Sequence, residues 1–179
     1  PILVLTKGLK YEKKSNKVFT ISEQLQKHYK VRNISILKGP CLAKELARKK
    51  QTSVIIANKN ISAAKKIGKI ISTKYYLTEF SNDVIGIEVC SAIKNIYSMI
   101  IGAGQSLNAS SNLFQKSIIE MKYLTKYFKG REETTLSLAG VGDLYVSAAG
   151  GRNSKMGRYL GKGYTFKYAK TRFMPNDRV

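Results

Sequence analysis

One lysine lies in an unusually apolar segment of the sequence. Lys94 is flanked by Ala92 and Ile93 on one side and by Ile96 and Tyr97 on the other, and lysine is uncommon in such surroundings unless it has a partner or a task. A partly desolvated lysine beside other cations has a lowered pKa, so it can donate and accept a proton near neutral pH. A lysine that extends along a helix edge into solvent fits the composition equally well.

Two turns in the first part of the sequence could present groups to an anion. Lys7 lies between Thr6 and Gly8, directly after an apolar run, and ligands of α/β proteins bind at the carboxyl ends of strands. Gly39 and Pro40 follow a second apolar run and precede a helical pattern, so backbone N–H groups at that helix start could meet an anion. Taken alone, an exposed strand-end lysine and an ordinary turn are the commoner interpretations.

Two glycine-rich segments late in the sequence carry polar side chains. Asp143 follows Gly140-Val141-Gly142, and Arg152 and Asn153 follow Gly150-Gly151. Together with the lysines described above, these segments could place cationic and polar groups around one anion.

The elements that would position these residues alternate up to about residue 83. Continuous apolar runs predict strands buried on both faces of a parallel sheet, and apolar residues at helical spacing predict helices between them. The sequence predicts strands at 1–6, 33–37, 52–57 and 75–80, and helices at 15–29, from 42 onward and at 60–72. This alternation is typical of a doubly wound α/β unit with right-handed crossovers.

From residue 83 onward the pattern is helical. It predicts a long apolar helix to about 104, a helix at about 113–128, a loop-rich stretch through 140–151 and a short basic helix at 154–160. No closing element is apparent before Val179. We therefore expect an α/β unit over residues 1–83, followed by a helical unit over residues 84–179.

Composition and charge exclude some classes of protein. The chain has 179 residues, of which 43% are hydrophobic, and a net charge of +21. A chain with this hydrophobic content can bury a core, which excludes a disordered polycation. Its length excludes a large multidomain enzyme. The charge has no basic tail, with 18 basic and 5 acidic residues up to residue 83 and 14 and 6 after it. A nucleic-acid-binding module is an alternative, although no helix-turn-helix, RRM or zinc signature is present.

The cysteines and the apolar runs bear on compartment. Cys41 and Cys90 are far apart and lack metal-ligand spacing, so we interpret both as buried thiols, expect no metal site and take a reducing cytoplasm as the compartment. No uninterrupted apolar run approaches the roughly 20 residues of a membrane span, so we expect none. The start, Pro1 to Leu5, has neither the basic region nor the cleavage site of a signal peptide.

Seven motifs occur in one order along the chain, from residue 1 to about residue 163. They are Thr6-Lys7-Gly8, Gly39-Pro40 with Ala43 and Glu45, Asp83-Val84-Ile85-Gly86 with Glu88, Ala92-Ile93-Lys94-Asn95, Glu120-Met121, Leu138-Ala139-Gly140-Val141-Gly142-Asp143-Leu144 and Gly151-Arg152-Asn153. Together they resemble the NAD(P)-dependent sn-glycerol-3-phosphate dehydrogenase family. The resemblance implies the second half of a Rossmann-type dinucleotide-binding domain, followed by part of an all-α substrate-binding domain.

The resemblance also implies an activity and a site. Members interconvert dihydroxyacetone phosphate and sn-glycerol 3-phosphate with NAD or NADP, which serves phospholipid synthesis. Lys94 matches the catalytic acid/base, and Arg152 and Asn153 match the phosphate-binding pair. Substrate contacts are implied for Lys7, Gly39, Cys41, Asn95, Asp143, Ser147, Gly151, Arg152 and Asn153, and cofactor contacts for Lys7, Ala43 and Arg152.

Some positions depart from the family pattern. Lys38 and Cys41 stand where small hydroxyl or other polar residues are usual, and Ser91 stands where glycine is usual. No G-x-G-x-x-G turn follows a first strand, so we expect little or no activity from these 179 residues alone, and an inactive remnant is a further alternative. For the full-length protein the resemblance implies a small-molecule substrate and a homodimer, with no nucleic-acid partner.

Overall fold

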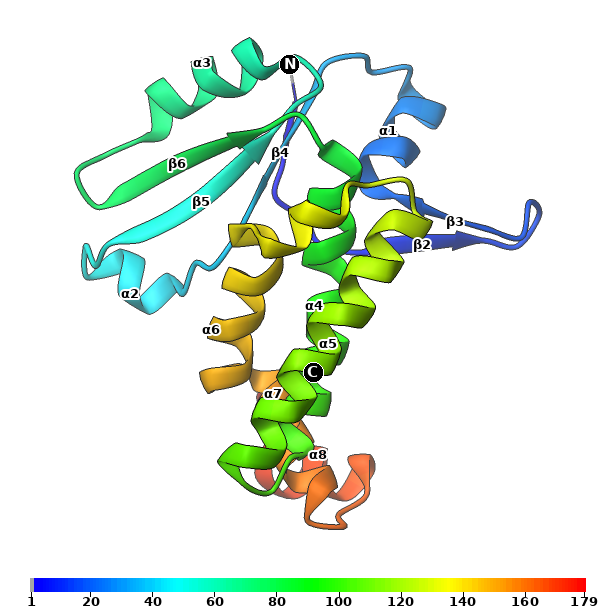
Figure 1. The fold of residues 1–179 in the computed structure, drawn as a ribbon, viewed down its shortest axis with the longest axis vertical. Helices are drawn as coiled ribbons and strands as arrows, with labels where there is room; N and C mark the ends of the chain where they lie inside the picture. Colours follow the sequence, from blue (N-terminus) through cyan, green and yellow to red (C-terminus); the bar gives the residue numbers. More distant parts are fainter. Residues whose placement is uncertain (1) are drawn as a thin grey trace.

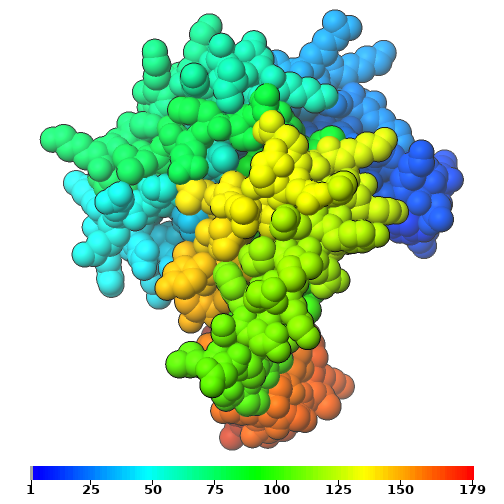
Figure 2. Space-filling view, in the orientation of Figure 1, coloured from blue at the N-terminus to red at the C-terminus, as the bar shows by residue number. Residues whose placement is uncertain are grey.

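A four-stranded sheet at one end and a long helical part at the other make up the protein (Figure 1), and the computed structural model describes residues 2–179. Figure 2 shows the broad sheet part and the narrower helical part, which ends in the orange region around the last helices. All strands precede residue 83 and the longest helices follow it. The fold class expected from the sequence is confirmed, whereas the division into units at 83/84 stays a prediction.

The sheet consists of β1 (Ile2–Val4), β4 (Ile34–Lys38), β5 (Thr52–Ala57) and β6 (Tyr76–Ser81), in the order β1-β4-β5-β6. β1 pairs with β4, and β5 with β6, in parallel. Inward-facing Ile36, Ile55 and Ala57 form the core together with Ile87 of the first long helix. Because β1 and β4 are parallel neighbours, their carboxyl ends lie side by side.

The expected doubly wound arrangement is wrong at one step, because β4 and β5 are antiparallel. A parallel return needs a crossover that covers the sheet, usually an α-helix. The connection here holds only α2 (Ala43–Ala47), which has no buried residue, so no apolar helix face is available to cross the sheet. Gly39 begins this connection at a φ of 126°, and a Cβ there would lie 3.2 Å from the Cα of Val54.

A hairpin of β2 (Leu9–Glu12) and β3 (Lys17–Thr20) replaces the start of the helix predicted at 15–29. The actual helix, α1 (Ile21–Tyr29), begins after a capping box in which Thr20 and Glu23 bond each other's backbone N–H groups. The turn of the hairpin contains no glycine or proline, and Asn16 adopts a φ of 52°. This is why turn chemistry in the sequence did not reveal it.

α3 (Ile61–Ile71) covers the β5–β6 side, and α4 (Val84–Ala103) then leads from the sheet into the helical part. Asp83 caps α4: its Oδ1 accepts from the Gly86 N–H at 3.0 Å, and its Oδ2 accepts from the Arg131 N–H at 2.8 Å and the Thr134 hydroxyl at 2.6 Å. One carboxylate thus fixes the start of α4 against a segment almost 50 residues later.

The helical part is more regular than the sequence predicted. α5 (Leu107–Tyr127) starts six residues earlier than expected, and the stretch predicted to be rich in loops is mostly helical. η1 (Glu132–Leu136) precedes this stretch, and the π-helical turn η2 (Leu138–Gly142) and α6 (Asp143–Gly150) occupy most of it. α7 (Arg152–Gly161) and α8 (Phe166–Phe173) follow. Glycine in this stretch permits close packing rather than loops, since a Cβ on Gly140 would lie 2.0 Å from the Thr135 carbonyl oxygen. The sequence pattern did not indicate α8.

α4 is long and apolar enough, by length and composition, to cross a membrane, which a search for uninterrupted apolar runs overlooked. In the structure, 67% of its most apolar segment is buried, and the neighbours of Ile93, Tyr97 and Ile101 include Met121 and Leu144 from other helices. α4 is therefore the central helix of the protein core.

Candidate functional site

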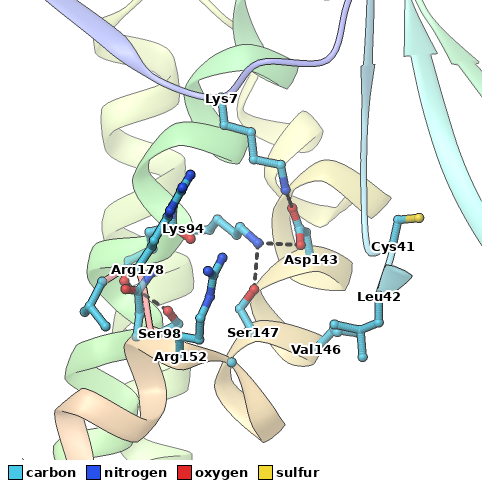
Figure 3. A pocket seen from close by; sticks show the side chains of 14 residues that line it. Lys7, Cys41, Leu42, Lys94, Ser98, Asp143, Val146, Ser147, Arg152 and Arg178 are labelled. Atoms are coloured by element: carbon cyan, nitrogen blue, oxygen red, sulfur yellow. Dashed lines mark hydrogen bonds and ion pairs between the residues drawn. The ribbon is translucent and has the colours of Figure 1, made fainter. Parts of the chain in front are cut away.

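A cavity of about 420 Å³ lies where the carboxyl ends of β1 and β4 meet α4, α6 and α7 (Figure 3). Nine of its lining residues carry a role implied by the resemblance in sequence, and they come from α4, α6, the start of α7 and the segments that follow β1 and β4. The lining consists of Lys7, Cys41, Leu42, Lys94, Asn95, Ser98, Asp143, Val146, Ser147, Gly151, Arg152, Asn153, Arg178 and Val179. The fold thus brings together residues that lie up to 172 positions apart.

A cluster of hydrogen-bonded charged groups lies at the centre of this cavity. Lys94 Nζ donates to Asp143 Oδ1 at 2.6 Å and to the Ser147 hydroxyl oxygen at 2.6 Å. Lys7 Nζ donates to the other carboxylate oxygen of Asp143, also at 2.6 Å. Figure 3 shows the two lysines approaching Asp143 from different parts of the chain, Lys94 from α4 and Lys7 from the segment after β1. Asp143 is therefore shared by two ammonium groups.

The local fold explains why these side chains meet. Asp143 is the first residue of α6, directly after the π-helical turn η2, and Ser147 lies four residues later, which places both on one face of α6. Lys94 lies near the middle of α4 and faces α6. Lys7 extends from the segment after β1, so the sheet and the helices each contribute one lysine.

Burial sets the protonation behaviour of Lys94. The Lys94 and Asp143 side chains are only 8% and 4% exposed. Desolvation lowers the pKa of Lys94 from 10.5 to about 8; the Asp143 carboxylate opposes this shift, and the Lys7 ammonium adds to it. Both the ammonium and the amine form of Lys94 are thus accessible near neutral pH, as expected for a group that exchanges protons.

A second set of polar groups lies at the start of α7. Gly151 is the N-cap residue of this helix, and Arg152 and Asn153 are its first residues, so free backbone N–H groups and a guanidinium occur together at the cavity. α7 packs very closely on α4: a Cβ on Gly157 would lie 1.9 Å from the Met99 carbonyl oxygen. This packing holds Arg152 on the same side of the cavity as Lys94 (Figure 3).

Two of the implied contact residues do not line the cavity. Gly39 is buried at the end of β4, where its backbone approaches β5. Ala43 is the exposed first residue of α2. Their implied roles stay predictions, as do those of the residues that do line the cavity.

The interpretation of both cysteines as buried thiols is correct for Cys90 and wrong for Cys41. Cys90 is buried, with its sulfur 3.3 Å from the Thr125 hydroxyl. Cys41 is exposed at the cavity, because the connection after β4 runs over the surface. Partial burial of Cys41 raises the pKa of its thiol, which disfavours the thiolate form.

Sequence reasoning missed several lining residues. Ser98 lies four positions after Lys94 on α4, so helical spacing alone could have placed it beside the lysine. Arg178 follows α8, near the end of the chain, and adds a fourth cation to the lining. No motif or periodicity in the sequence marks Arg178.

In architecture, the protein falls in the class of Rossmann-type α/β proteins with an all-helical second part, and its cavity lies where the two parts meet. Two family models match the sequence: the NAD-dependent glycerol-3-phosphate dehydrogenase N-terminus over residues 1–64, and the C-terminus of the same family over residues 83–176. The chain belongs to the NAD-dependent glycerol-3-phosphate dehydrogenase family. This confirms the resemblance carried by the seven motifs.

Individual relatives agree with this assignment. The chain is 33% identical over 180 residues to the NADP(+)-dependent glycerol-3-phosphate dehydrogenase of Archaeoglobus fulgidus, covering 94% of this chain and 53% of that protein. It is 36% identical over 144 residues to glycerol-3-phosphate dehydrogenase [NAD(P)+] of Phytoplasma australiense, covering 76% of this chain and 44% of that protein. The chain therefore spans about half the length of the curated relatives it matches.

Solved structures show the same fold. The crystal structure of glycerol-3-phosphate dehydrogenase from Coxiella burnetii superimposes with a TM-score of 0.86 at 29% identity, covering 96% of this chain and 53% of that one. The Plasmodium falciparum enzyme superimposes with a TM-score of 0.88 at 22% identity, covering 99% of this chain and 51% of that one, and supports the fold alone.

Proposed function

We propose that the full-length protein carrying this chain interconverts dihydroxyacetone phosphate and sn-glycerol 3-phosphate with NAD or NADP. The observation that carries this proposal is the Lys94–Asp143–Ser147 cluster, which faces a cavity lined by four cationic side chains. A cluster that exchanges one proton suits the reduction of a ketone to an alcohol, and the surplus of cations suits a phosphorylated substrate.

Lys94 is the proton donor and acceptor in this proposal. In reduction, its ammonium gives a proton to the oxygen that develops negative charge as the carbonyl carbon is reduced. In oxidation, the neutral amine takes the proton from the substrate hydroxyl. The pKa of about 8 supports both directions, because neither form is rare near neutral pH.

Asp143, Ser147 and Lys7 orient and tune Lys94. Asp143 and Ser147 accept hydrogen bonds from Lys94 Nζ and so fix the direction of its third N–H or lone pair toward the cavity. Lys7 lowers the pKa of Lys94 by its positive charge. Asn95 and Cys41 complete the polar lining around the reacting carbon.

Arg152, Asn153 and the start of α7 bind the substrate phosphate in this proposal. A guanidinium can pair with two phosphate oxygens at once, and the backbone N–H groups at a helix start favour an anion. Gly151 lets the start of α7 pack closely against α6, because a Cβ there would lie 2.4 Å from the Ser147 carbonyl oxygen.

The residues present fit the reactive end of a nicotinamide cofactor. The carboxyl ends of β1 and β4 form the edge at which Rossmann-type sheets bind dinucleotides, and Lys7, Ala43 and Arg152 would contact the cofactor at or near this edge. When bound, the cofactor supplies or accepts the hydride. The described residues contain no glycine-rich turn for the pyrophosphate, so these residues hold only part of the cofactor. We further propose a cytoplasmic homodimer that supplies phospholipid synthesis.

The test is the oxidation of NADH or NADPH by the full-length protein in the presence of dihydroxyacetone phosphate. Unphosphorylated dihydroxyacetone is the matched control substrate, since it has the same carbonyl but no anion for Arg152. We expect turnover with the phosphorylated substrate and at least about tenfold lower kcat/KM without the phosphate. A folded protein that oxidises neither cofactor with dihydroxyacetone phosphate contradicts the proposed function.

A further inference from the structure

A third lysine lies beside the cluster but outside the cavity. Lys38 is the last residue of β4 and is only 2% exposed. It does not line the cavity, so it is not placed to touch a substrate there. A lysine this deeply buried is rare unless its ammonium group is paired. The group that the Lys38 ammonium binds therefore indicates the role of Lys38.

That partner is a backbone oxygen. Lys38 Nζ donates a hydrogen bond to the carbonyl oxygen of Thr6. The parallel ladder between β1 and β4 ends at the pair Val4 and Ile36, and the same register continued by two residues would bring Thr6 beside Lys38. The lysine side chain therefore ties β1 to β4 just beyond the point where their backbone pairing stops.

Charged groups on three other elements surround Lys38. Glu88 of α4 and Asp143 of α6 favour its ammonium form, and Lys7 opposes it; burial outweighs them and lowers the pKa of Lys38 to about 8. Glu88 is itself 2% exposed and accepts from the Ser22 backbone N–H at 3.1 Å. The lysine is thus held in a fixed, partly compensated environment rather than on a mobile surface.

The hydrogen bond acts on the residue next to Lys7. Thr6 and Lys7 share a peptide group, and Lys7 Nζ reaches Asp143 Oδ2 at 2.6 Å while its side chain is still 33% exposed. Lys7 follows the last residue of β1 by only three positions and has no backbone ladder to hold it. The contact made by Lys38 is what anchors the main chain at this point.

We propose that Lys38 is a positioning residue that holds Lys7 on Asp143 by binding the Thr6 carbonyl oxygen. Its consequence for catalysis rests on the proposed role of Lys94. Because Lys7 lowers the pKa of Lys94, releasing Lys7 raises that pKa. Lys38 therefore sets the protonation of Lys94 at a distance, through Thr6, Lys7 and Asp143.

The test measures the pKa of Lys94 by competitive amine labelling and mass spectrometry, in the full-length protein, between about pH 6 and 10. Lys38→Met keeps an unbranched apolar side chain of similar reach and removes the ammonium; exposed Lys66→Met on α3 is the matched control. We expect Lys38→Met to raise the Lys94 pKa by about one unit, a roughly tenfold lower amine fraction, and Lys66→Met to leave it unchanged. An unchanged Lys94 pKa in Lys38→Met overturns the proposal.

A double variant separates positioning from a direct charge effect. Lys7→Met should raise the Lys94 pKa as well, and adding Lys38→Met should then change it no further, because both act through one side chain. If Lys38→Met still adds its whole shift when Lys7 is absent, Lys38 acts by its own charge and the proposal is wrong. Labelling needs no turnover, so an inactive protein with the expected shifts would contradict the proposed function alone.

A measurement without any substitution at Lys38 covers the case in which Lys38→Met does not fold. The backbone nitrogen of Lys7 belongs to the peptide group that Lys38 binds, so its NMR chemical shift should follow the titration of Lys38. In a Lys94→Met background, which removes the other group with a pKa of about 8, we expect a step in that shift near pH 8. A flat profile overturns the proposal.

Discussion

Lys94 Nζ lies 2.6 Å from Oδ1 of Asp143, and both side chains are almost completely buried. An ion pair in such a place loses most of its hydration, so its presence costs free energy that packing elsewhere must offset. The same burial lowers the pKa of Lys94 to about 8. Burial of the pair therefore lowers the stability of the fold, but it also gives Lys94 the protonation equilibrium that proton transfer requires.

Asp143→Asn should move the pH dependence of the reaction in a defined direction. Asp143 raises the pKa of Lys94, so removing its charge lowers that pKa further. Oxidation of glycerol 3-phosphate needs the neutral amine of Lys94, so the rate of oxidation rises as the pH increases through the Lys94 pKa. This rise should occur at lower pH in Asp143→Asn. Reduction, which needs the ammonium, should weaken at neutral pH. A kcat/KM profile that shifts upward instead would contradict the assignment.

Arg152→Leu should weaken substrate binding more than chemistry. The guanidinium is exposed to the cavity and close to the start of α7, and a charge-assisted bond to phosphate contributes about 1.5 to 3 kcal/mol. We expect KM for dihydroxyacetone phosphate to rise about ten- to hundredfold with a smaller change in kcat. Arg158→Leu, on the same helix but outside this cavity, is the control and should leave KM near its original value.

Gly157→Ala should destabilise the protein and disturb the site together. A Cβ at this position would lie 1.9 Å from the Met99 carbonyl oxygen, so α7 must move away from α4. Such overpacking costs about 1 to 3 kcal/mol, which thermal unfolding would reveal as a lower Tm. Gly150→Ala is the matched control, because nothing lies within 4 Å of its Cβ position. Equal Tm values for the two variants would contradict the close packing of α4 and α7.

The purified 179-residue chain should show little or no oxidation of NADH or NADPH. β1 lies at the edge of the sheet, and Leu5 just beyond it is 61% exposed, a combination that favours association between chains. In the proposed function, the residues present would also contact only one end of a dinucleotide. Circular dichroism and light scattering would report folding and association alongside the assay. Turnover at the rate of the full-length protein would show that these residues form a sufficient site.

Sequence reasoning located the acid/base candidate but not its direct contacts. The apolar neighbours of Lys94 fitted both a buried lysine and a lysine that extends into solvent, and the structure shows the buried one, with 7% of the residue exposed. The contact with Asp143, 49 positions away, depends on how α6 packs on α4, and neither spacing nor periodicity contains that information. The sequence could place both residues near one anion, and the family resemblance assigned both to one site.

The fold was predictable to a similar extent. Short apolar runs located the first three strands of the sheet, and the aromatic-rich segment at 75–80 located β6, which also contains Thr78 and Glu79. The antiparallel pairing of β4 and β5 was not predictable, since it depends on where the chain goes after Gly39 rather than on either strand. The hairpin before α1 was also missed, because its turn uses Asn16 in a left-handed conformation without glycine or proline.

The central claim is that Lys94 exchanges the proton in the dehydrogenase reaction. Its most direct test is turnover of dihydroxyacetone phosphate by full-length Lys94→Met, beside the Lys66→Met control, with circular dichroism and cofactor titration on each. We predict a loss of kcat of about a hundredfold or more in Lys94→Met, with folding and cofactor affinity nearly unchanged. Near-normal turnover by folded Lys94→Met would contradict the claim.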